Sequence, residues 1–561
     1  MVRYSSIKQL AIEDFDTTFY NKLNPANKWV QLAQLLPWDD LVFIYTRKMS
    51  TVKGRPSISA RLAVSSLIIK HMEGLDDRGV VMALEENIYL QYFAGYSSFR
   101  VKRPFDPSLL VTIRKRMGIQ EYDDMTSLII NIAEPILQEI KKNKEDKKKK
   151  TKSSKSNKAK NDENKEEQKM NENDSSEPMP EEEIIEKESE STEAPIENKG
   201  KLKLDATVCD QMILYPTDLG LVSRSREESE RIIDILFEKS ALKIKPRTYR
   251  IKAKKESLNT LKKKRKTEKE IRKVLGKQLN YLKRNIRIIH SLLDEFDRIP
   301  LVFRDLKIFW TIQLIYDQQV LMYKNRVHSC ENRIVNIYQP YVRPIPRGKD
   351  KHKIEFGAKI GVSEIDGFSR VDNFSWEAYN ETTDLETQVE NYKSKYGFYP
   401  ECLLVDQIYL SIKNRQFLKE KGIRHTGIQL GRPKPMTRAE KKKLKEERGE
   451  RNHIEGKFGQ GKNAYELSMI RMRRSDTSKS AIAGIFFVMN LVRLLKITRE
   501  LSALMVIFMA FHVICHFFTQ LKSKSRTLWA VCMSKFQEVG SFVEGVSGKM
   551  DRSPGFLPYL S

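Results

Sequence analysis

Residues 203–208 read KLDATV, a mostly apolar and β-branched run that one carboxylate, Asp205, interrupts. Such a run is typical of a β-strand. Residues 401–409, ECLLVDQIY, have the same character and reach a second carboxylate, Asp406. We expect both segments to be strands of one sheet, each with its aspartate at a strand end.

The segments around these two strands alternate between strand and helix patterns. Residues 354–362, IEFGAKIGV, predict a strand, and Asp366-Gly367 predicts the turn of a hairpin. Helices are expected at 384–396 and 413–421, and a further strand near 423–428. This order predicts an α/β fold in which helices cover one mixed sheet. A charged helix from residue 438 and an apolar core helix at 481–496 should follow.

The N-terminal part has helical periodicity instead. Leu62, Leu67 and Met72 recur at the spacing of one helix face, Gly74 ends that helix, and Asp76 is placed as the N-cap of the next. A third, basic helix follows Pro104 and carries Arg114, Lys115 and Arg116. Three such helices fit a helix-turn-helix variant that contacts DNA, and they fit a small packed bundle equally well.

Charge is unevenly distributed along the chain. Its 561 residues include 101 Lys and Arg against 74 Asp and Glu, a formal net charge of +27, which argues for a polyanionic partner. Residues 141–199 hold 15 Lys and 17 Asp and Glu with few apolar residues. Because this composition buries too little apolar area to offset the cost of ordering, we predict a disordered linker there.

The positive charge concentrates in a helical stretch after the first strand. Residues 241–290 hold 19 Lys and Arg against 3 Asp and Glu, including the run Lys262, Lys263, Lys264, Arg265 and Lys266. A solvated helix or a localisation signal would account for this composition. We favour a helical arm that tracks DNA, because phosphates would neutralise the charge.

The cysteines and the amino terminus bear on the compartment. The five cysteines, an odd number, are far apart and form no CxxC pair. A disulfide framework or zinc ribbon is therefore not expected, and a reducing compartment is. Acidic residues stand where a signal peptide would be apolar, which predicts an intracellular protein. The apolar run 503–518 has 16 residues, fewer than the ~20 that cross a bilayer, so no membrane is favoured.

A third carboxylate, Glu455, lies on the charged helix. Together with Asp205 and Asp406 it supplies the oxygen ligands that a hard divalent cation prefers. Two such ions could cleave a phosphodiester bond. Each carboxylate alone is more often solvated or paired, so spacing by itself leaves both interpretations open.

Several longer blocks resemble a known family. Residues 202–234, 356–368, 403–424 and 450–473 resemble the catalytic blocks of bacterial insertion-sequence DDE transposases, closest to the eleven-eighty-two subgroup of the insertion sequence five family. GRPSISARLAVSSLIIKHMEGLDD and FDPSLL, at 54–77 and 105–110, resemble the helical N-terminal domain of the same group. The blocks occur in the family's order and cover most of residues 20–500 outside the charged linker.

The resemblance implies roles for individual residues. Asp205, Asp406 and Glu455 would be the catalytic carboxylates on a ribonuclease-H-like sheet and would bind two Mg²⁺ or Mn²⁺ ions. Arg451 and Lys462 match the family's arginine four before and lysine seven after the glutamate, whereas Arg448 stands where the family has a tyrosine. Position in the sequence, and not the resemblance, suggests two further roles: Lys457 would add charge toward DNA or simply be solvated, and Tyr409, three residues after Asp406, could stack on a base or simply pack.

The implied organisation has a helical N-terminal domain, the disordered linker, a first catalytic segment, a basic helical insertion, the rest of the catalytic domain and a tail of unassigned role, at residues 1–140, 141–200, 201–226, 227–345, 346–500 and 501–561. The expected activity is transposition, with terminal inverted repeats and target DNA as partners, a homodimer or higher assembly on DNA, and a bacterial cytoplasm near the nucleoid. A nuclease without strand transfer and a non-catalytic DNA-binding protein remain alternatives.

Overall fold

The computed structural model describes residues 23–50, 57–159, 197–346, 354–431 and 435–522, without the side chains of 145–159 and 504–522. The chain divides into two compact units. The first comprises Met1–Ile132 and Glu172–Arg493, and the second comprises Ala133–Asn171 and Leu494–Ser561. All residues discussed below as a site belong to the first unit.

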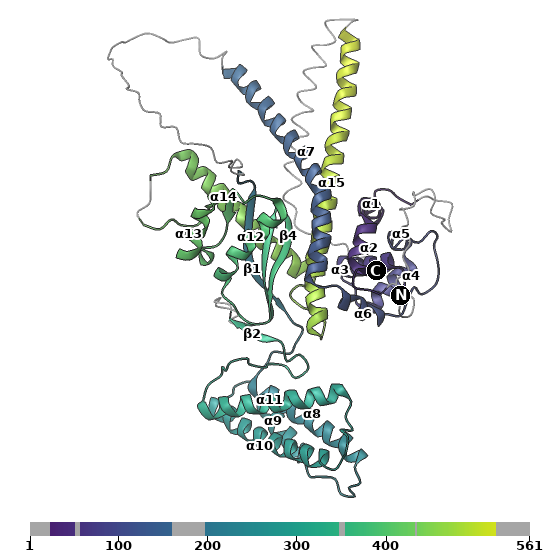
Figure 1. Cartoon of the computed structure of the whole chain (residues 1–561), viewed down its shortest axis with the longest axis vertical. Coiled ribbons are helices and arrows are strands. Elements are labelled where there is room, and N and C mark those ends of the chain that lie inside the picture. Colours follow the sequence, from purple (N-terminus) through teal and green to yellow (C-terminus); the bar gives the residue numbers. More distant parts are fainter. Residues whose placement is uncertain (1–22, 51–56, 160–196, 347–353, 432–434, 523–561) are drawn as a thin grey trace, which may run out of the picture. The chain divides into compact units, whose positions relative to one another are not determined.

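A mixed β-sheet organises the C-terminal part of the first unit (Figure 1). β1 (Lys201–Asp210) pairs antiparallel with β3 (Ile354–Ile365) on one side and parallel with β5 (Cys402–Leu404) on the other. β6 (Arg424–His425) continues the sheet in parallel beyond β5, whereas β2 (Arg343–Pro346) and β4 (Phe368–Ser375) both pair antiparallel with β3. The predicted mixed α/β architecture is confirmed.

Two strands differ in length from the prediction. β1 continues to Asp210 because β3 pairs with it over that whole stretch, so Asp205 lies in the middle of the strand and not at its end. β5 has only three residues instead of the predicted 401–409. It stops because the Asp406 carboxylate accepts a hydrogen bond from the Gln407 backbone N–H at 2.7 Å and starts a 3₁₀ turn.

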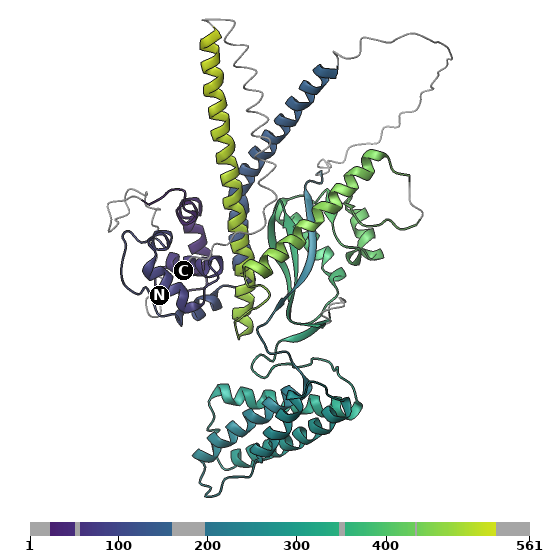
Figure 2. The same cartoon turned by 180° about the vertical axis from the view of Figure 1, so that it is seen from behind.

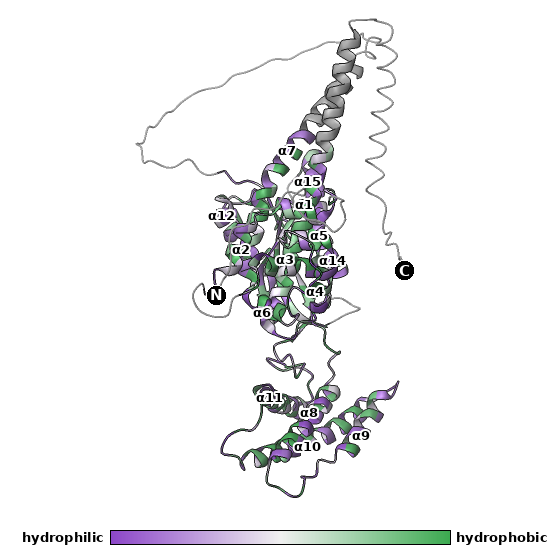
Figure 3. Ribbon diagram, turned by 90° about the vertical axis from the view of Figure 1, so that its right-hand side faces the viewer, coloured by the Kyte–Doolittle hydropathy of each residue, from purple (hydrophilic) through white to green (hydrophobic). Residues whose placement is uncertain are grey.

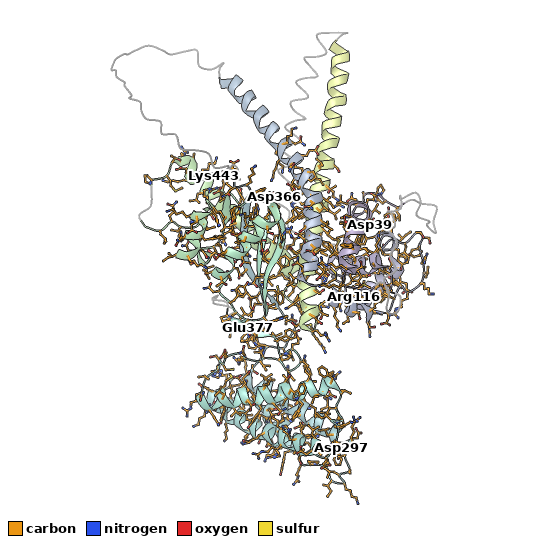
Figure 4. All side chains as sticks on the ribbon, in the orientation of Figure 1. Asp39, Arg116, Asp297, Asp366, Glu377 and Lys443 are labelled. Atoms are coloured by element: carbon orange, nitrogen blue, oxygen red, sulfur yellow. The ribbon has the colours of Figure 1, made fainter. Side chains whose placement is uncertain are left out.

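The hairpin between β3 and β4 turns where the sequence predicted it. Asp366 and Gly367 have φ angles of 51° and 87°, the left-handed conformation at both central positions of a type I′ turn. Ile365 pairs with Phe368 across this turn. Asp366 is labelled at the tip of the hairpin in Figure 4.

Helices cover both faces of the sheet. α12 (Leu385–Tyr396) and α13 (Ile412–Glu420) bury apolar side chains against Leu202 and Leu204 of β1. α14 (Arg438–Ala464) and the first part of α15 (Ser475–Lys522) do so on the face of Cys209. Alternate residues of a strand point to opposite faces, so even and odd positions of β1 serve the two layers. Figure 2 shows α14 crossing the sheet.

The N-terminal region is helical, as predicted. Asp76 is confirmed as an N-cap, because its side chain accepts from the Gly79 backbone N–H at 2.7 Å. Arg114 of the basic helix is buried and bonds both oxygens of Asp77, at 2.6 and 2.7 Å, so its charge serves packing. The helices are α1 (Lys28–Leu35), α2 (Trp38–Thr46), α3 (Ala60–Met72), α4 (Asp77–Glu86), α5 (Ile88–Phe93) and α6 (Leu109–Arg116).

Between β1 and β2 the chain forms a group of four helices, α8 (Asp218–Lys239), α9 (Arg250–Lys262), α10 (Glu268–Leu293) and α11 (Phe303–Asn325). α8 begins earlier than the predicted boundary at residue 227, because Thr217 caps it through the Gly220 backbone N–H. One apolar cluster joins α8, α10 and α11. Hydrophobic and hydrophilic residues alternate along these helices (Figure 3), as expected where one face of each is buried.

The predicted linker differs from the structure at its start. α7 spans Ile119–Ala159, so residues 141–159 are helical and not disordered. Lysine, which makes up ten of these 19 residues, is a good helix former and favours helix here. The rest of the predicted linker up to residue 196 lies outside the described residues.

α15 contains the predicted core helix. The buried side chains of residues 481–495 include Ile482, Phe486 and Leu491. Its segment Ser475–Ala503 is long and apolar enough to cross a membrane, but most of it is buried inside the protein, as a core helix would be. The side chains of the apolar run from 504 onward lie outside the described residues.

Candidate active site

Asp205 lies half-buried on the β1 face that α14 covers. Its neighbours on this face define the contact. Lys201 Nζ donates to Glu450 Oε2 of α14 at 2.8 Å, and Cys209 lies in one apolar cluster with Ile454 and Phe458 of α14. Asp205 is midway between Lys201 and Cys209 on the strand, so its side chain points toward the middle of α14.

Glu455 follows the buried Ile454 on α14, and 55% of its side chain is exposed. Arg451, one helical turn earlier, donates from Nη2 to Glu455 Oε1 at 3.1 Å. Only 22% of the Arg451 side chain is exposed. The arginine is the more buried partner of this ion pair, and it holds one oxygen of the Glu455 carboxylate.

Electrostatic interactions link Asp205 to this pair. Burial raises the pKa of Asp205, and the negative charges of Glu381 and Glu455 raise it further. The Ala206 backbone N–H, which donates to Asp205 Oδ1 at 2.8 Å, and the Arg451 cation lower the pKa. The net result is a pKa of about 6 in place of 3.8. Asp205 and Glu455, 250 residues apart in sequence, thus share one acidic region.

Asp406 follows β5, the parallel neighbour of β1. In the parallel pairing of β1 with β5, Lys203 lies opposite Leu404. The strand pairing ends there, and the backbone of Asp406, two residues later, is extended, with φ −75° and ψ 159°. The charges that act on the Asp205 pKa are those of Glu381, Arg451 and Glu455. The Asp406 carboxylate bonds the Gln407 N–H within its own chain segment.

Glu381 is a functional candidate that sequence reasoning missed. It begins a 3₁₀ turn after β4 and bonds Lys359 of β3 at 2.9 Å, yet its charge acts on Asp205. No motif or spacing marks this residue. Only the sheet topology, which brings the end of β4 and the middle of β1 together through β3, reveals it.

The acidic residues do not form a preassembled cage. Across the described ranges, no three His, Cys, Asp or Glu side chains are close enough together to hold a metal ion. Each carboxylate has its own partner instead. Glu455 pairs with Arg451, Glu381 pairs with Lys359, and Asp406 accepts a hydrogen bond from the backbone. The donor chemistry suits a hard cation, since all are oxygen ligands. Crowding of negative charge around Asp205 is the condition that a bound cation would relieve.

The predicted cations near Glu455 differ in their surroundings. Arg451 lies in the acidic region. Lys462 lies farther along the strand: its Nζ is 3.9 Å from Oε1 of the buried Glu355, and its charge acts on Cys209, which is four residues after Asp205 on β1. Lys457 is half-buried on α14. Arg448, at the position of the family's tyrosine, donates to the Thr426 carbonyl at 3.2 Å.

Tyr409 lies in the core, whereas the run at residues 262–266 lies on the surface. Tyr409 is fully buried in the apolar cluster under α12 and α13, so it packs and cannot stack on a base. The basic region is helical, as predicted from the sequence, but most of the lysine run is not: Lys262 ends α9, and residues 263–266 form the exposed connection to α10. A Thr267 capping box starts α10 directly after it, and Lys263 bonds Glu270 at 3.0 Å.

Comparison with known proteins gives two family matches. A Transposase domain (DUF772) matches residues 17–116, and a Transposase DDE domain matches residues 403–492, which include Asp406 and Glu455 but not Asp205.

A Rhizobium meliloti protein described as "Uncharacterized protein ORF8 in nfe locus" is 32% identical over 114 residues, 20% of this chain. The matched part is 53% of that protein, so the chain spans about half of its length. No solved structure matches the chain. Two separate stretches of the chain are thus similar to transposase domains.

Proposed function

We propose that the protein is a DDE transposase that cuts the ends of its element and joins them to target DNA, within the eleven-eighty-two-like subgroup of the insertion sequence five family. One observation carries this proposal. Asp205 on β1 and Glu455 on α14 interact electrostatically, in a chain whose transposase DDE domain match includes Asp406 and Glu455.

The sheet supports a ribonuclease-H-like assignment for this domain. Three strands, β4, β3 and β1, are mutually antiparallel in order, and β5 and β6 continue in parallel from β1. The first carboxylate lies on the first strand, in the middle of the sheet. The helices α8–α11 then occupy the place of an insertion between β1 and β3.

We propose Asp205, Asp406 and Glu455 as the ligands of two divalent cations, Mg²⁺ or Mn²⁺. When bound, such ions polarise the scissile phosphate and activate water or a 3′-hydroxyl as nucleophile. The chain itself positions these ligands. Strand pairing on both sides of β1 holds Asp205, and the ion pair with Arg451 holds Glu455. With a cation bound at Glu455, Arg451 would be available to a DNA phosphate.

We propose double-stranded DNA in the bacterial cytoplasm as the substrate, both as terminal inverted repeats and as target. The net charge of +27 supports a polyanionic partner. The exposed run 262–266 and the other basic residues of α9 and α10 would make sequence-independent phosphate contacts, which position DNA and do not read bases.

The test combines cleavage, strand transfer and binding on DNA that carries the element's ends. Asp205→Asn, Asp406→Asn and Glu455→Gln should each lose cleavage and retain DNA affinity. Asp297→Asn is the matched control, because this exposed carboxylate lies in the loop after α10 (Figure 4). Cleavage by any of the three variants would refute the assignment, and cleavage by the wild type without joining of pre-cut ends would reduce the activity to that of a nuclease.

A further inference from the structure

A cavity of about 560 Å³ lies between the N-terminal helices and the connection from α14 to α15. α3, the first turn of α4 and α6 line one side of it, and residues 465–474 with the start of α15 line the other. Both sides belong to the first unit. The volume is within the range of about 300–1,000 Å³ that is typical of small-molecule sites.

The wall formed by residues 465–474 is attached to the end of β1. The Ile470 backbone N–H donates to the Asp210 carbonyl at 2.8 Å, and the Met212 N–H donates to the Ile470 carbonyl at 2.9 Å. Asp210 is five residues after Asp205, roughly 17 Å along the strand at 3.3 Å per residue. The cavity is therefore preformed by the sheet and is separate from the proposed catalytic carboxylates, none of which lines it.

Apolar side chains line the cavity from both sides. Leu75 and Val111 belong to the N-terminal side, and Tyr465, Ile470 and Ile485 belong to the other. Tyr465 is half-buried at the end of α14 and supplies an aromatic ring, against which a flat ring packs favourably. These walls suit a ligand with an apolar, aromatic body.

One buried polar group of the lining has no partner. His71 is only 7% exposed, and its Nε2 has no hydrogen-bond partner among the residues that the structure describes. Burial, with the nearby charges of Lys70 and Arg114, lowers the pKa of His71 to about 3, so the imidazole is neutral. A neutral imidazole nitrogen donates or accepts one hydrogen bond, and buried polar groups normally have a partner. A ligand with a polar edge would supply it.

The charge available in the cavity is positive. Its acidic side chains are already engaged in hydrogen bonds within the protein, namely Asp76, Asp77 and Glu466. Arg78 and Arg473 also line the cavity and are exposed, and within the described ranges neither has an ion-pair partner. Guanidinium groups bind phosphate through strong, charge-assisted hydrogen bonds. The two arginines are thus suited to the anionic end of a ligand.

We propose that this cavity binds one nucleotide, with its base between the apolar walls, a polar edge of the base at His71 and its phosphate at Arg78 and Arg473. An aliphatic anion would leave the His71 nitrogen without a partner, and inorganic phosphate would leave the apolar walls uncovered. The nucleotide is either free in solution or an unpaired nucleotide of a DNA strand, since both present the same base and phosphate. The proposal does not depend on the catalytic assignment, because binding is measured without cleavage.

The first experiment is calorimetric titration of the full chain, in a chelating buffer, with each of the four deoxynucleoside 5′-monophosphates. At least one should bind one-to-one and more tightly than its unphosphorylated nucleoside or inorganic phosphate. Arg78→Gln and Arg473→Gln should each weaken binding by about 10–100-fold, because each removes a hydrogen bond to a charged group, and should leave nucleoside affinity unchanged. Val111→Phe should weaken both nucleotide and nucleoside, because it fills the cavity.

The second experiment identifies the source of the nucleotide. It compares a DNA duplex that has one unpaired nucleotide with the fully paired duplex. A preference for the unpaired nucleotide that Val111→Phe removes would assign the site to DNA, whereas monophosphate binding without this preference would assign it to a free nucleotide.

The controls separate this site from the general attraction of a basic protein for anions. Arg298→Gln, at an exposed arginine in the loop after α10, should leave both measurements unchanged. Arg78→Gln and Arg473→Gln should keep the wild-type circular dichroism spectrum, because both positions are exposed. Three results would overturn the proposal: no binding in either experiment, inorganic phosphate binding as tightly as every monophosphate, or nucleotide binding that survives both arginine substitutions.

Discussion

Replacing the central carboxylate should make the metal-free protein more stable. Asp205 is half-buried beside two like charges, and ionising it costs free energy in the folded state that it does not cost in the unfolded chain. Asp205→Asn removes this cost. The asparagine Oδ1 can still accept the hydrogen bond from the Ala206 backbone N–H, so the local structure should persist.

The size and sign follow from the pKa shift. The folded-state pKa of about 6 lies above the ordinary value of 3.8, so the folded protein retains a proton between these values that the unfolded chain has lost. The stability of the wild type relative to Asp205→Asn therefore falls as pH rises from about 4 to 6, and the difference is constant at higher pH. A shift of about two units corresponds to about 3 kcal/mol, an upper bound because the folded protein can relax around the charge.

The assay is urea unfolding of wild type and Asp205→Asn in a chelating buffer, at pH 4 and pH 7.5. The variant should be more stable at pH 7.5, by about 1–3 kcal/mol, and equal at pH 4. Asp297→Asn should show neither change. Mg²⁺ or Mn²⁺ should stabilise the wild type and not the variant. Equal or lower stability of the variant at pH 7.5 would refute the crowding of carboxylates around Asp205.

Three further outcomes are expected. Arg424→Leu should lower the free energy of unfolding in urea by about 2 kcal/mol, because the buried Glu447 loses two hydrogen bonds of 2.6 Å. Since Arg424 lowers the pKa of Glu447, this loss of stability should fade as pH drops below 4.5. Ile312→Ala, in the buried core, should cost about 2–5 kcal/mol, whereas Leu314→Ala on the exposed side should change monomer stability by less than about 0.5 kcal/mol, measured by thermal unfolding at low concentration. Alanine at all of residues 262–266 should flatten the salt dependence of DNA binding by about 0.9 per lost phosphate contact, and an unchanged slope would mean that the run does not touch DNA.

Local signals in the sequence predicted the parts of the fold that depend on neighbouring residues. The β3–β4 turn needed only Asp366-Gly367, because these two residue types tolerate positive φ, and the start of α4 needed only Asp76 as a cap. Such features involve a few consecutive residues. They can be predicted without knowing which strands are neighbours.

Features that depend on distant partners could not be predicted. β1 is longer than its apolar run because β3, about 150 residues later, pairs with it to the end. Glu381 acts on Asp205 only because β3 joins their strands. The pairing of Lys462 with Glu355 likewise requires the contact between α14 and β3. For each of these residues the sequence shows a charge, but the three-dimensional neighbour decides its role.

The two aspartates are an intermediate case, in which distant residues can be related by number. Parallel strands in register keep a constant difference in residue number, and β1 and β5 pair with a difference of 201, from Lys201 with Cys402 to Lys203 with Leu404. Asp205 and Asp406 differ by the same 201 positions. A one-residue slip of β5 would turn its apolar residues away from α12 and α13 and Asp406 away from Asp205. The register that buries Leu403 therefore gives the two aspartates equal offsets along their segments, which is the arrangement that the proposed shared site requires.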